Sequence, residues 1–595
     1  MHPLFCISLN ELRAGKARGS CCLPVVKADD STICVCDAYG QRPARSLLFS
    51  LILVFVFAFA STSIVAAGKT SARAGENTSV KAGENIYRAG LLGSGEEIES
   101  VRETGIVTRG ADAACVNCHR RSALGAKEGR GAIPPVAGPY LYQPRAKEGK
   151  DIGLPFVDGM RGDREPYTDA TLARAIREGV DSEGKPLSFL MPHFKLNDED
   201  MAALIAYLKS INQRRVPGVG DTVLHFATII TPDADPIKRR GMLDVLEHFF
   251  ADRNVRQMGT APPMRSSNTT AYSRSMNMIH RQWLLHVWEL TGPESTWGEQ
   301  LDKHYAKEPV FATISGLAGK SWAPVHTFCE RKALPCIFPN VEAPPMEADR
   351  DFYTLYLNKG VLLEAELIAS RIRESGNPVK VIQIYREGDI GDYAAAALSV
   401  ALKKDGIVPT VKIIAREAPV ESVAAAFQSG DTAIVLWLRP ADIMALTNPP
   451  PETATIYLSG LMGGLERTPL PSEWRSRTQI PYGFDLPEKR RVRVDFALGW
   501  FNIRKIPIVA EQVQADTYLA CGLLSETLKH MIDTFVQDYL VERVQDILEH
   551  RALTGYYPRL TMAPGQRFAS KGGYMVHLSE SMNQRVIADR EWIVP

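Results

Sequence analysis

The sequence lacks a surplus of either charge. It holds 69 lysines and arginines against 68 aspartates and glutamates, a formal net charge of +1. Nucleic-acid-binding proteins normally show a basic surplus that neutralises phosphate, so we expect no nucleic-acid partner. A dominant low-complexity tract is also missing, and 45% hydrophobic with 23% charged residues is typical of folded soluble proteins. A chain of 595 residues is too long for one compact core, which predicts several domains.

The sequence also lacks a recognisable catalytic set. It contains no HExxH motif, and we find no convincing nucleophile–base pair or paired-carboxylate site. Gly319-Lys320-Ser321 lacks the preceding glycine that a phosphate-binding loop requires. These absences favour a carrier or a binding protein over an enzyme.

Cysteine is scarce and unevenly placed. Five of the ten cysteines lie in the first 36 residues, two lie at 115 and 118, and the others are Cys329, Cys336 and Cys521. A disulfide-rich exported protein usually shows a more even, paired pattern. We therefore interpret residues 1–45 as an N-terminal lead that is removed or not translated. Cys329 and Cys336 form either a disulfide or two buried thiols, and we expect Cys521 in a core.

A single long apolar run spans residues 47–67. Arg42 and Arg45 precede it, and small residues near its end suit a signal peptidase. Residues 46–67 are therefore a signal peptide or an uncleaved membrane anchor, because about 20 apolar residues just span a bilayer. Both alternatives place the rest of the chain outside the cytoplasm, which predicts a periplasmic location. Residues 68–84 are typical of a flexible linker.

The sequence does contain one CxxCH motif, Cys115-Val116-Asn117-Cys118-His119. Two thiols on one helical turn can each add to a haem vinyl group, and the adjacent imidazole can bind the iron. Half of a zinc site is the alternative, but it would need a second Cys or His pair nearby. The only other histidine of this region is His193. The motif therefore predicts one covalently attached haem c and an exported electron-transfer protein.

Residues 85–215 resemble a class I cytochrome c. Met191-Pro192 lies downstream of the CxxCH motif and precedes a helix that is marked by an Asn197 N-cap and apolar residues at helical spacing. The resemblance implies an all-α domain in which His119 and Met191 are the axial iron ligands. His193 and Met160 are the rivals of Met191 for that role.

The same resemblance implies two further residues of the haem pocket. Pro134-Pro135 resembles the loop whose proline carbonyl orients the proximal imidazole, which assigns Pro135 to the pocket. Tyr167 stands before the helix that in this family precedes the methionine loop, and we assign it to the pocket as well.

Residues 221–595 show short apolar strands that alternate with helices. This pattern predicts parallel sheets covered by helices, and the length of the segment suits two lobes. The predicted strands are 223–230, 284–290, 310–314, 336–338, 379–385, 410–414, 433–438 and 455–458, and the predicted helices are 236–252, 294–307, 351–375 and 392–404.

This second module resembles a type I periplasmic binding protein of the branched-chain amino-acid receptor kind. The segments that carry the resemblance are 309–321, 334–339 and 379–393. The resemblance implies a cleft between two α/β lobes, where a helix N-terminus binds the ligand carboxylate. The cleft candidates it gives are Ser315, Ser321 and Tyr393, whereas the bulky Trp322 argues against a free amino acid as ligand.

Together these features predict a periplasmic monohaem cytochrome fused to a binding-protein-like module. The haem would carry single electrons between a periplasmic dehydrogenase and the respiratory chain, with a dehydrogenase or a terminal-chain cytochrome as redox partner, while the second module serves docking or ligand sensing. The alternative is a receptor-like protein that binds a small molecule and whose haem domain reports or responds to it. A third hypothesis, an oxidoreductase with substrate in the cleft, needs an open iron position that His/Met ligation does not leave.

Overall fold

The computed structural model describes residues 78–128, 131–142, 164–211, 216–258, 281–346, 351–376, 380–419, 432–446, 454–531, 534–550, 555–563, 565–581 and 585–595. The chain divides into two units, Met1–Arg73 and Ala74–Pro595, and all described residues belong to the second. The predicted lead and the predicted signal peptide or anchor therefore lie outside the described residues. Among the helices that the structure describes, none is both long and apolar enough to cross a bilayer.

The first described element is a helix at 78–89. Residues 78–84 are therefore helical, and the prediction of a flexible linker is wrong for them. The helix is held by its close packing against α5 (Asp198–Ser210): a Cβ atom at Gly83 would lie 2.0 Å from the Ala203 carbonyl oxygen. Only glycine permits this approach of the two helices.

Residues 78–211 form the N-terminal module, whose core is built by helices. The helices that follow the first one are η1 (Gly110–Ala113), α2 (Val116–His119), α3 (Gly138–Tyr142), α4 (Asp169–Glu178) and α5. The module is not purely helical as predicted, because it also contains a small antiparallel sheet of order β2-β1-β5 and a hairpin β3–β4. These strands are β1 (Glu99–Val101), β2 (Val107–Arg109), β3 (Ala126–Glu128), β4 (Gly131–Ile133) and β5 (His193–Lys195). Three-residue strands are too short to show a periodic pattern in sequence.

Helices α4 and α5 begin where their capping residues lie. Thr168 and the residue three positions later, Thr171, form a capping box at the start of α4, and Gly179 ends the helix with a left-handed φ of 71°. The Asn197 side chain accepts the N–H of Asp200 at 2.8 Å and caps α5. These caps fix both ends of the loop that contains Met191.

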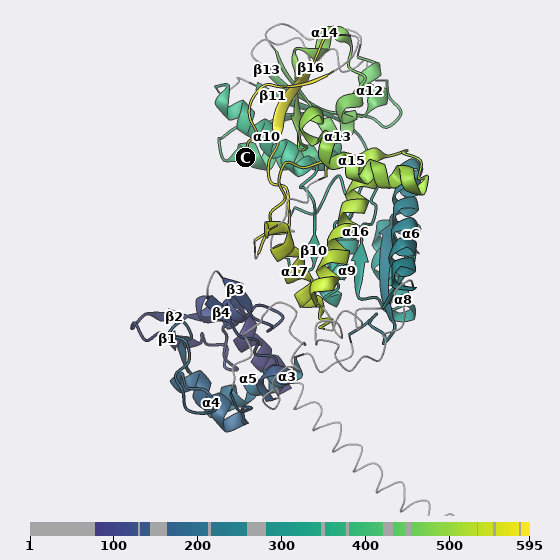
Figure 1. Cartoon of the computed structure of the whole chain (residues 1–595). Helices are drawn as coiled ribbons and strands as arrows, with labels where there is room; N and C mark the ends of the chain where they lie inside the picture. The colour runs from purple at the N-terminus through teal and green to yellow at the C-terminus, as the bar shows by residue number, and fades with distance from the viewer. Residues whose placement is uncertain are drawn as a thin grey trace, which may run out of the picture. The chain divides into compact units, whose positions relative to one another are not determined.

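Lobe 1 is built on a parallel sheet with the strand order β10-β9-β8-β6-β7. Its helices pack on the two faces of the sheet, and α6 lies beside α16 in Figure 1, consistent with their many contacts. The strands are β6 (Val223–Ile230), β7 (Gln282–Glu289), β8 (Ala312–Ile314), β9 (Cys336–Ile337) and β10 (Thr354–Leu355). The helices are α6 (Pro236–Met258), η2 (Glu294–Thr296), α8 (Trp297–Lys307), α9 (Ala323–Lys332), α16 (Glu511–Met531) and α17 (Gln537–His550).

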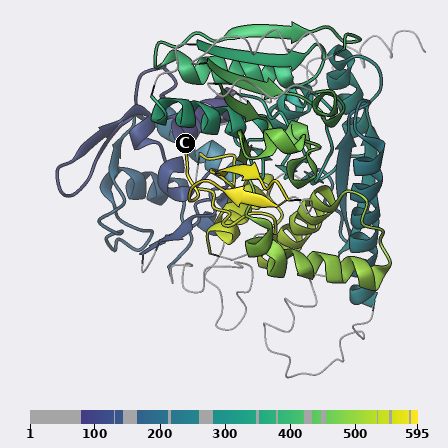
Figure 2. The same cartoon turned by 90° about the horizontal axis from the view of Figure 1, so that it is seen from above.

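Lobe 2 is built on a sheet with the order β12-β11-β13-β14-β15-β16-β17, in which only the pairs that involve β16 and β17 are antiparallel. Figure 2 shows these two C-terminal strands in yellow. The strands are β11 (Lys380–Arg386), β12 (Thr410–Ile414), β13 (Thr432–Trp437), β14 (Thr455–Leu458), β15 (Thr478–Tyr482), β16 (Tyr574–Leu578) and β17 (Val586–Ala588). The helices are α10 (Val361–Glu374), α11 (Gly391–Lys403), α12 (Pro440–Met444), α13 (Gly460–Gly463), η5 (Leu465–Arg467) and α14 (Ser472–Arg475).

The chain passes between the lobes more than once. It leaves lobe 1 after β10, returns through α15 (Pro487–Arg504) to α16 and α17, and enters lobe 2 again for β16. Two of these passages run side by side, because Tyr356 and Phe568 form a parallel bridge and Tyr356 donates its N–H to the Arg567 carbonyl. This connectivity gives the predicted two-lobed α/β architecture.

Candidate functional site

The CxxCH motif forms a single helical turn. Cys115 has helical backbone angles and directly precedes α2, and the His119 N–H donates to the Cys115 carbonyl at 2.9 Å. The turn ends at Arg120, whose φ is 64°. Asn117 ties it to the preceding segment by donating to the Ala111 carbonyl at 2.8 Å. Both thiols and the imidazole are thus carried by one short, fixed turn.

The His119 imidazole has one nitrogen engaged and one available. His119 is buried, and its Nδ1 lies 2.9 Å from the Pro134 carbonyl oxygen. A proton on Nδ1 satisfies this contact and leaves the Nε2 lone pair for a metal. Burial lowers the pKa of His119, which favours the neutral form that binds metals.

The loop that orients His119 uses a different proline from the one we assigned. The carbonyl belongs to Pro134, whereas Pro135 is buried beside it. Gly125 makes this arrangement possible, because its φ is +74° and a Cβ atom there would lie 2.0 Å from the Ile133 carbonyl oxygen. The Gly125 N–H donates to the His119 carbonyl at 3.1 Å, which joins the loop to the CxxCH turn.

The candidates for the second axial position lie in different settings. Met191 ends a tight turn, with its N–H 2.8 Å from the Ser188 carbonyl, and packs half-buried on the same apolar core as Cys115. His193 is on β5, and its side chain lies against Gly179. A Cβ atom added to Gly179 would come within 2.3 Å of the His193 Nε2. Met160 lies outside the described residues. The assignment of Met191 stays a prediction.

Tyr167 is buried in this core, and its ring stacks on the Arg164 guanidinium at 3.9 Å from the ring centroid. Its N–H donates to the Leu141 carbonyl, which anchors the residue before the cap of α4. Tyr167 therefore contributes to the core of the N-terminal module, and its assignment to the haem pocket stays a prediction.

The donor set of the N-terminal module fits a covalent haem. It offers two thiols on one turn and an oriented neutral imidazole, and a thioether packs on the same core as the first thiol. Among the described residues there is no cluster of three or more His, Cys, Asp or Glu side chains able to hold a metal ion. The zinc alternative therefore has no support within this part of the chain.

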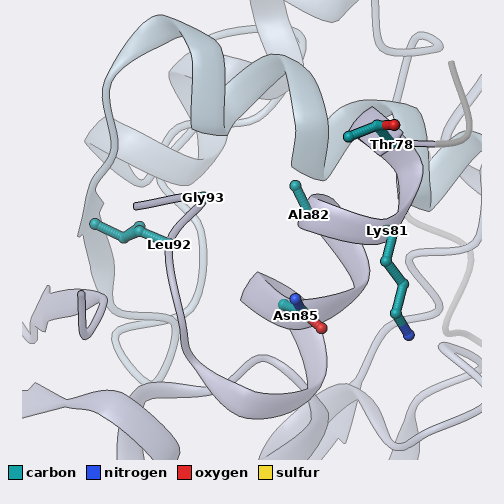
Figure 3. Close-up of a pocket in the computed structure, with 6 residues that line it drawn as sticks. All are labelled: Thr78, Lys81, Ala82, Asn85, Leu92 and Gly93. Atoms are coloured by element: carbon teal, nitrogen blue, oxygen red, sulfur yellow. The ribbon is translucent and has the colours of Figure 1, made fainter. Parts of the chain in front are cut away.

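A hollow of about 440 Å³ lies elsewhere on the N-terminal module, between the first helix and the loop after it. Figure 3 shows its lining residues on these two segments. They are Thr78, Lys81, Ala82, Asn85, Leu92 and Gly93. None of them is a residue that we assigned to the haem or to the interlobe cleft.

The three cleft candidates have separate partners. Ser315 is buried in lobe 1, where its hydroxyl lies 2.9 Å from that of Thr517 on α16. The Ser321 hydroxyl donates to Glu294 at 2.7 Å, and the Tyr393 hydroxyl donates to the Pro344 carbonyl at 2.6 Å. Their role as ligand-binding residues stays a prediction.

A charged network that the sequence analysis missed lies where the lobes meet. Glu342, which follows β9, accepts from Lys238 of lobe 1 at 2.6 Å and from Arg439 of lobe 2 at 2.9 Å. Arg439 also donates twice to Asp389, at 2.8 and 3.0 Å. The Lys320 ammonium donates to the Gly388 carbonyl and adds a second link between the lobes. The sequence does give a signal for this network, because a charged residue follows shortly after each of three strands: Glu342 after β9, Asp389 after β11 and Arg439 after β13.

The opposite charges of this network keep Glu342 and Arg439 ionised, although burial alone would shift the pKa of each group toward its neutral form. Burial alone would raise the pKa of Glu342, but Lys238 and Arg439 outweigh it, and the pKa is lowered. Burial likewise opposes the charge of Arg439, which Glu342 and Asp389 overcome to raise its pKa. The pKa of Asp389 is also lowered, because Arg439 outweighs the effect of burial, so Glu342, Asp389 and Arg439 are all charged at neutral pH.

Comparison with protein families shows to which family the N-terminal module belongs. The family model for cytochrome c matches residues 109–212, which therefore form a cytochrome c domain, and this family carries covalently bound haem c. No curated protein matches the chain. The predicted resemblance of the N-terminal module to cytochrome c is confirmed.

The solved structures similar to this chain include periplasmic binding proteins and transporter substrate-binding proteins. A periplasmic substrate-binding protein from Ralstonia solanacearum is 11% identical and aligns over 62% of this chain and all of its own, with a TM-score of 0.45. A branched-chain amino-acid transporter protein from Thermus thermophilus with bound valine is 9% identical over 63% of this chain and 97% of its own, with the same TM-score. A fatty-acid transporter substrate-binding protein from Thermomonospora curvata is 14% identical over 64% and 95%, with a TM-score of 0.44. At these values the likeness carries no conclusion on function, and the two-lobed architecture rests on the sheets themselves.

Proposed function

We propose that this chain is a periplasmic monohaem c-type cytochrome that carries single electrons between a dehydrogenase and the respiratory chain. In this proposal the α/β module serves docking or ligand sensing. The observation that supports it most directly is the orientation of the His119 imidazole. His119 lies on the same turn as Cys115 and Cys118, and its Nδ1 is held by the Pro134 carbonyl oxygen. When bound, haem supplies a one-electron Fe(III)/Fe(II) couple.

The residues of the chain have distinct roles in this proposal. Cys115 and Cys118 tether the haem, His119 and Met191 bind the iron, and Pro134 keeps the proximal imidazole in one orientation. Export, either with cleavage of residues 46–67 or with their retention as an anchor, places the domain where covalent attachment of haem c occurs.

Haem staining of the purified protein after denaturation tests the proposal. We expect stain to remain with the wild-type chain that is produced together with export and haem-attachment machinery, and to be lost in the variant that carries both Cys115→Ala and Cys118→Ala. Cys521→Ala is the matched control, because Cys521 is a buried cysteine of α16 in lobe 1. Wild-type protein without covalent haem would contradict the proposal.

A second candidate function is binding of a small anionic ligand between the lobes. The observation that favours it is Arg439, which lies between the lobes and is neutralised by two carboxylates that a ligand carboxylate can replace. Calorimetric titration with a panel of small carboxylic acids tests this. We expect binding that Arg439→Leu abolishes, and absence of binding across the panel would leave docking as the role of the module.

A further inference from the structure

Helix α17 of lobe 1 holds the residues that directly follow the CxxCH turn. Ser122 donates its backbone N–H to Glu542 Oε1 at 2.9 Å and its hydroxyl to Oε2 at 2.5 Å. Ser122 is 1% exposed and Glu542 is 5% exposed. Both oxygens of this buried carboxylate in lobe 1 therefore accept hydrogen bonds from a single residue of the cytochrome domain.

The contact continues along one face of α17, where acidic residues recur every four positions as Asp538, Glu542 and Asp546. Arg88 of the first helix donates to Asp538 at 3.0 Å. Arg120, the residue after His119, lies 3.9 Å from Asp546. Basic residues of the cytochrome domain thus face acidic residues of lobe 1 on both sides of Ser122.

Apolar packing surrounds these charges. The Arg121 guanidinium lies over the rings of Phe352 and Tyr353, 4.6 and 5.2 Å from their centroids. Leu124 is 4% exposed and belongs to the same core cluster as Val541 of α17. The segment after the CxxCH turn is therefore packed into lobe 1, and the N–H and the hydroxyl of Ser122 are hydrogen-bonded there.

The Glu542 carboxyl changes its charge near neutral pH. Burial raises its pKa to about 7, while the hydrogen bonds from Ser122 lower it. Asp538 raises the pKa and Arg120 lowers it, and the phenols of Tyr87 and Tyr539 also interact with the carboxyl.

We propose that Glu542 is a positioning residue for the haem: it fixes Ser122, and thereby the turn that carries His119, and its charge tunes the redox potential of the iron. This inference rests on the proposed function, because it requires haem on His119. A carboxylate near the haem stabilises Fe(III) relative to Fe(II) and lowers the midpoint potential. A protonated Glu542 lacks this effect, so the potential falls as pH rises through the range where the carboxyl ionises.

Three variants separate geometry from charge. Glu542→Gln keeps an acceptor oxygen for Ser122 but removes the charge, Glu542→Ala removes both, and Ser122→Ala keeps the charge but removes one donor. Asp516→Asn is the matched control, because Asp516 is also a buried carboxyl of lobe 1 with its pKa raised by burial to about 7. The partners of Asp516 are Gln512 and Tyr557, both outside the cytochrome domain.

The experiment measures the midpoint potential of the haem-loaded full chain by spectroelectrochemistry between about pH 5 and 9, and the hydrogen exchange of the Ser122 amide. We expect the wild type and Asp516→Asn to show a potential that falls with pH. Glu542→Gln should be nearly independent of pH and lie above the wild type at alkaline pH. The Ser122 amide should exchange about tenfold faster in Glu542→Ala and stay near wild type in Glu542→Gln.

Unchanged pH dependence in haem-loaded Glu542→Gln would overturn the inference and leave the proposed function intact. Failure of haem to attach to the wild type would overturn the proposed function and this inference together. If Glu542→Ala does not fold, Glu542→Asp provides the geometric arm, because its carboxylate is one methylene shorter and cannot reach both donors of Ser122: a Ser122 amide that exchanges as slowly as in the wild type would count against the positioning role.

Discussion

At the scale of single residues, the second iron ligand is the sharpest question that the structure raises. Met191 packs on the core shared with Cys115, whereas the His193 imidazole lies close against Gly179, in space that only a glycine leaves open. Thioether ligation stabilises ferrous iron, so replacing it lowers the midpoint potential.

We therefore expect Met191→His to lower the potential by some tenths of a volt, within the span of about 0.8 V that axial ligands cover. Spectroelectrochemical titration measures this shift. His193→Gln is the control and should leave both the potential and the absorption spectrum unchanged. A His193→Gln variant with the altered spectrum would instead identify the histidine as the ligand.

The two cysteines of lobe 1 give a second prediction at this scale. Cys329 and Cys336 are both buried thiols, and the pKa of Cys329 is raised well above its ordinary value, chiefly by burial and further by the neighbouring Cys336. In an oxidising compartment, a protein disulfide of the folding machinery can accept their two electrons by exchange. We expect protein purified from the periplasm to contain this disulfide, which peptide mass mapping without reduction detects.

The loop that this disulfide closes is short, so chain entropy predicts stabilisation of about 2.5 kcal/mol. The double variant Cys329→Ser and Cys336→Ser should therefore lose stability of that order beyond the cost of altered packing. Cys521, which is buried in lobe 1, is the internal reference and should remain a thiol. Recovery of Cys329 and Cys336 as free thiols from exported protein would contradict the prediction.

At the scale of elements, sequence patterns predicted regular structure well where caps and long apolar runs mark it. The strands at 223–230, 410–414 and 455–458 have the predicted bounds, and the helix predicted after Tyr167 begins after the Thr168 cap and ends at Gly179. Strand β10 was missed, and the predicted helix 351–375 begins only at Val361, because a two-residue strand carries no period.

Tertiary contacts were beyond the reach of the same patterns. Glu542 and Ser122 are 420 residues apart, and Arg439 and Glu342 are 97 apart, so nothing local relates them. The proline loop was recognised, yet which of two adjacent carbonyls turns toward His119 depends on the backbone path that Gly125 permits. Sequence thus identified the haem turn, and the structure was needed to find what holds it.

The capping box of α4 allows a direct test at this scale. The Thr168 hydroxyl accepts the N–H of Thr171, and the Thr168 N–H donates in return to the Thr171 hydroxyl. We expect Thr168→Ala to lower the free energy of unfolding by about 1 kcal/mol, measured by chemical denaturation. Thr168→Ser keeps the hydroxyl and should stay near wild type, and equal losses in both variants would show that the cap is not the cause.

At the scale of the whole molecule, the network around Glu342 links the two lobes. Glu342→Gln removes the anion that Lys238 and Arg439 share. These side chains are only partly buried, so the loss should cost about 1–3 kcal/mol, between the values for exposed and for fully buried ion pairs. We expect the lobes to separate, which small-angle scattering detects as an increased radius of gyration. Glu366→Gln, which breaks the pair with Lys359, is the control. An unchanged radius would show that other contacts keep the lobes together.

Stability should also depend on pH through buried carboxyls, and Asp516 gives the clearest case. Burial raises its pKa from 3.8 to about 7 in the folded chain, against the hydrogen bonds from Gln512 and Tyr557. Between these two pH values the unfolded chain has lost the proton that the folded chain still holds, so stability falls as pH rises and levels off above about pH 7.

Asp516→Asn removes this ionisation. The stability of the variant minus that of the wild type should therefore increase by about 2–4 kcal/mol as the pH rises from 4 to 8. Urea denaturation at both pH values measures the difference, and the subtraction cancels the titration of every other group. A difference between wild type and Asp516→Asn that is the same at both pH values would mean that Asp516 ionises alike in the folded and unfolded chain. In that case the buried carboxyl would be solvated by water, and the matched pH control for Glu542 would have to be chosen elsewhere in lobe 1.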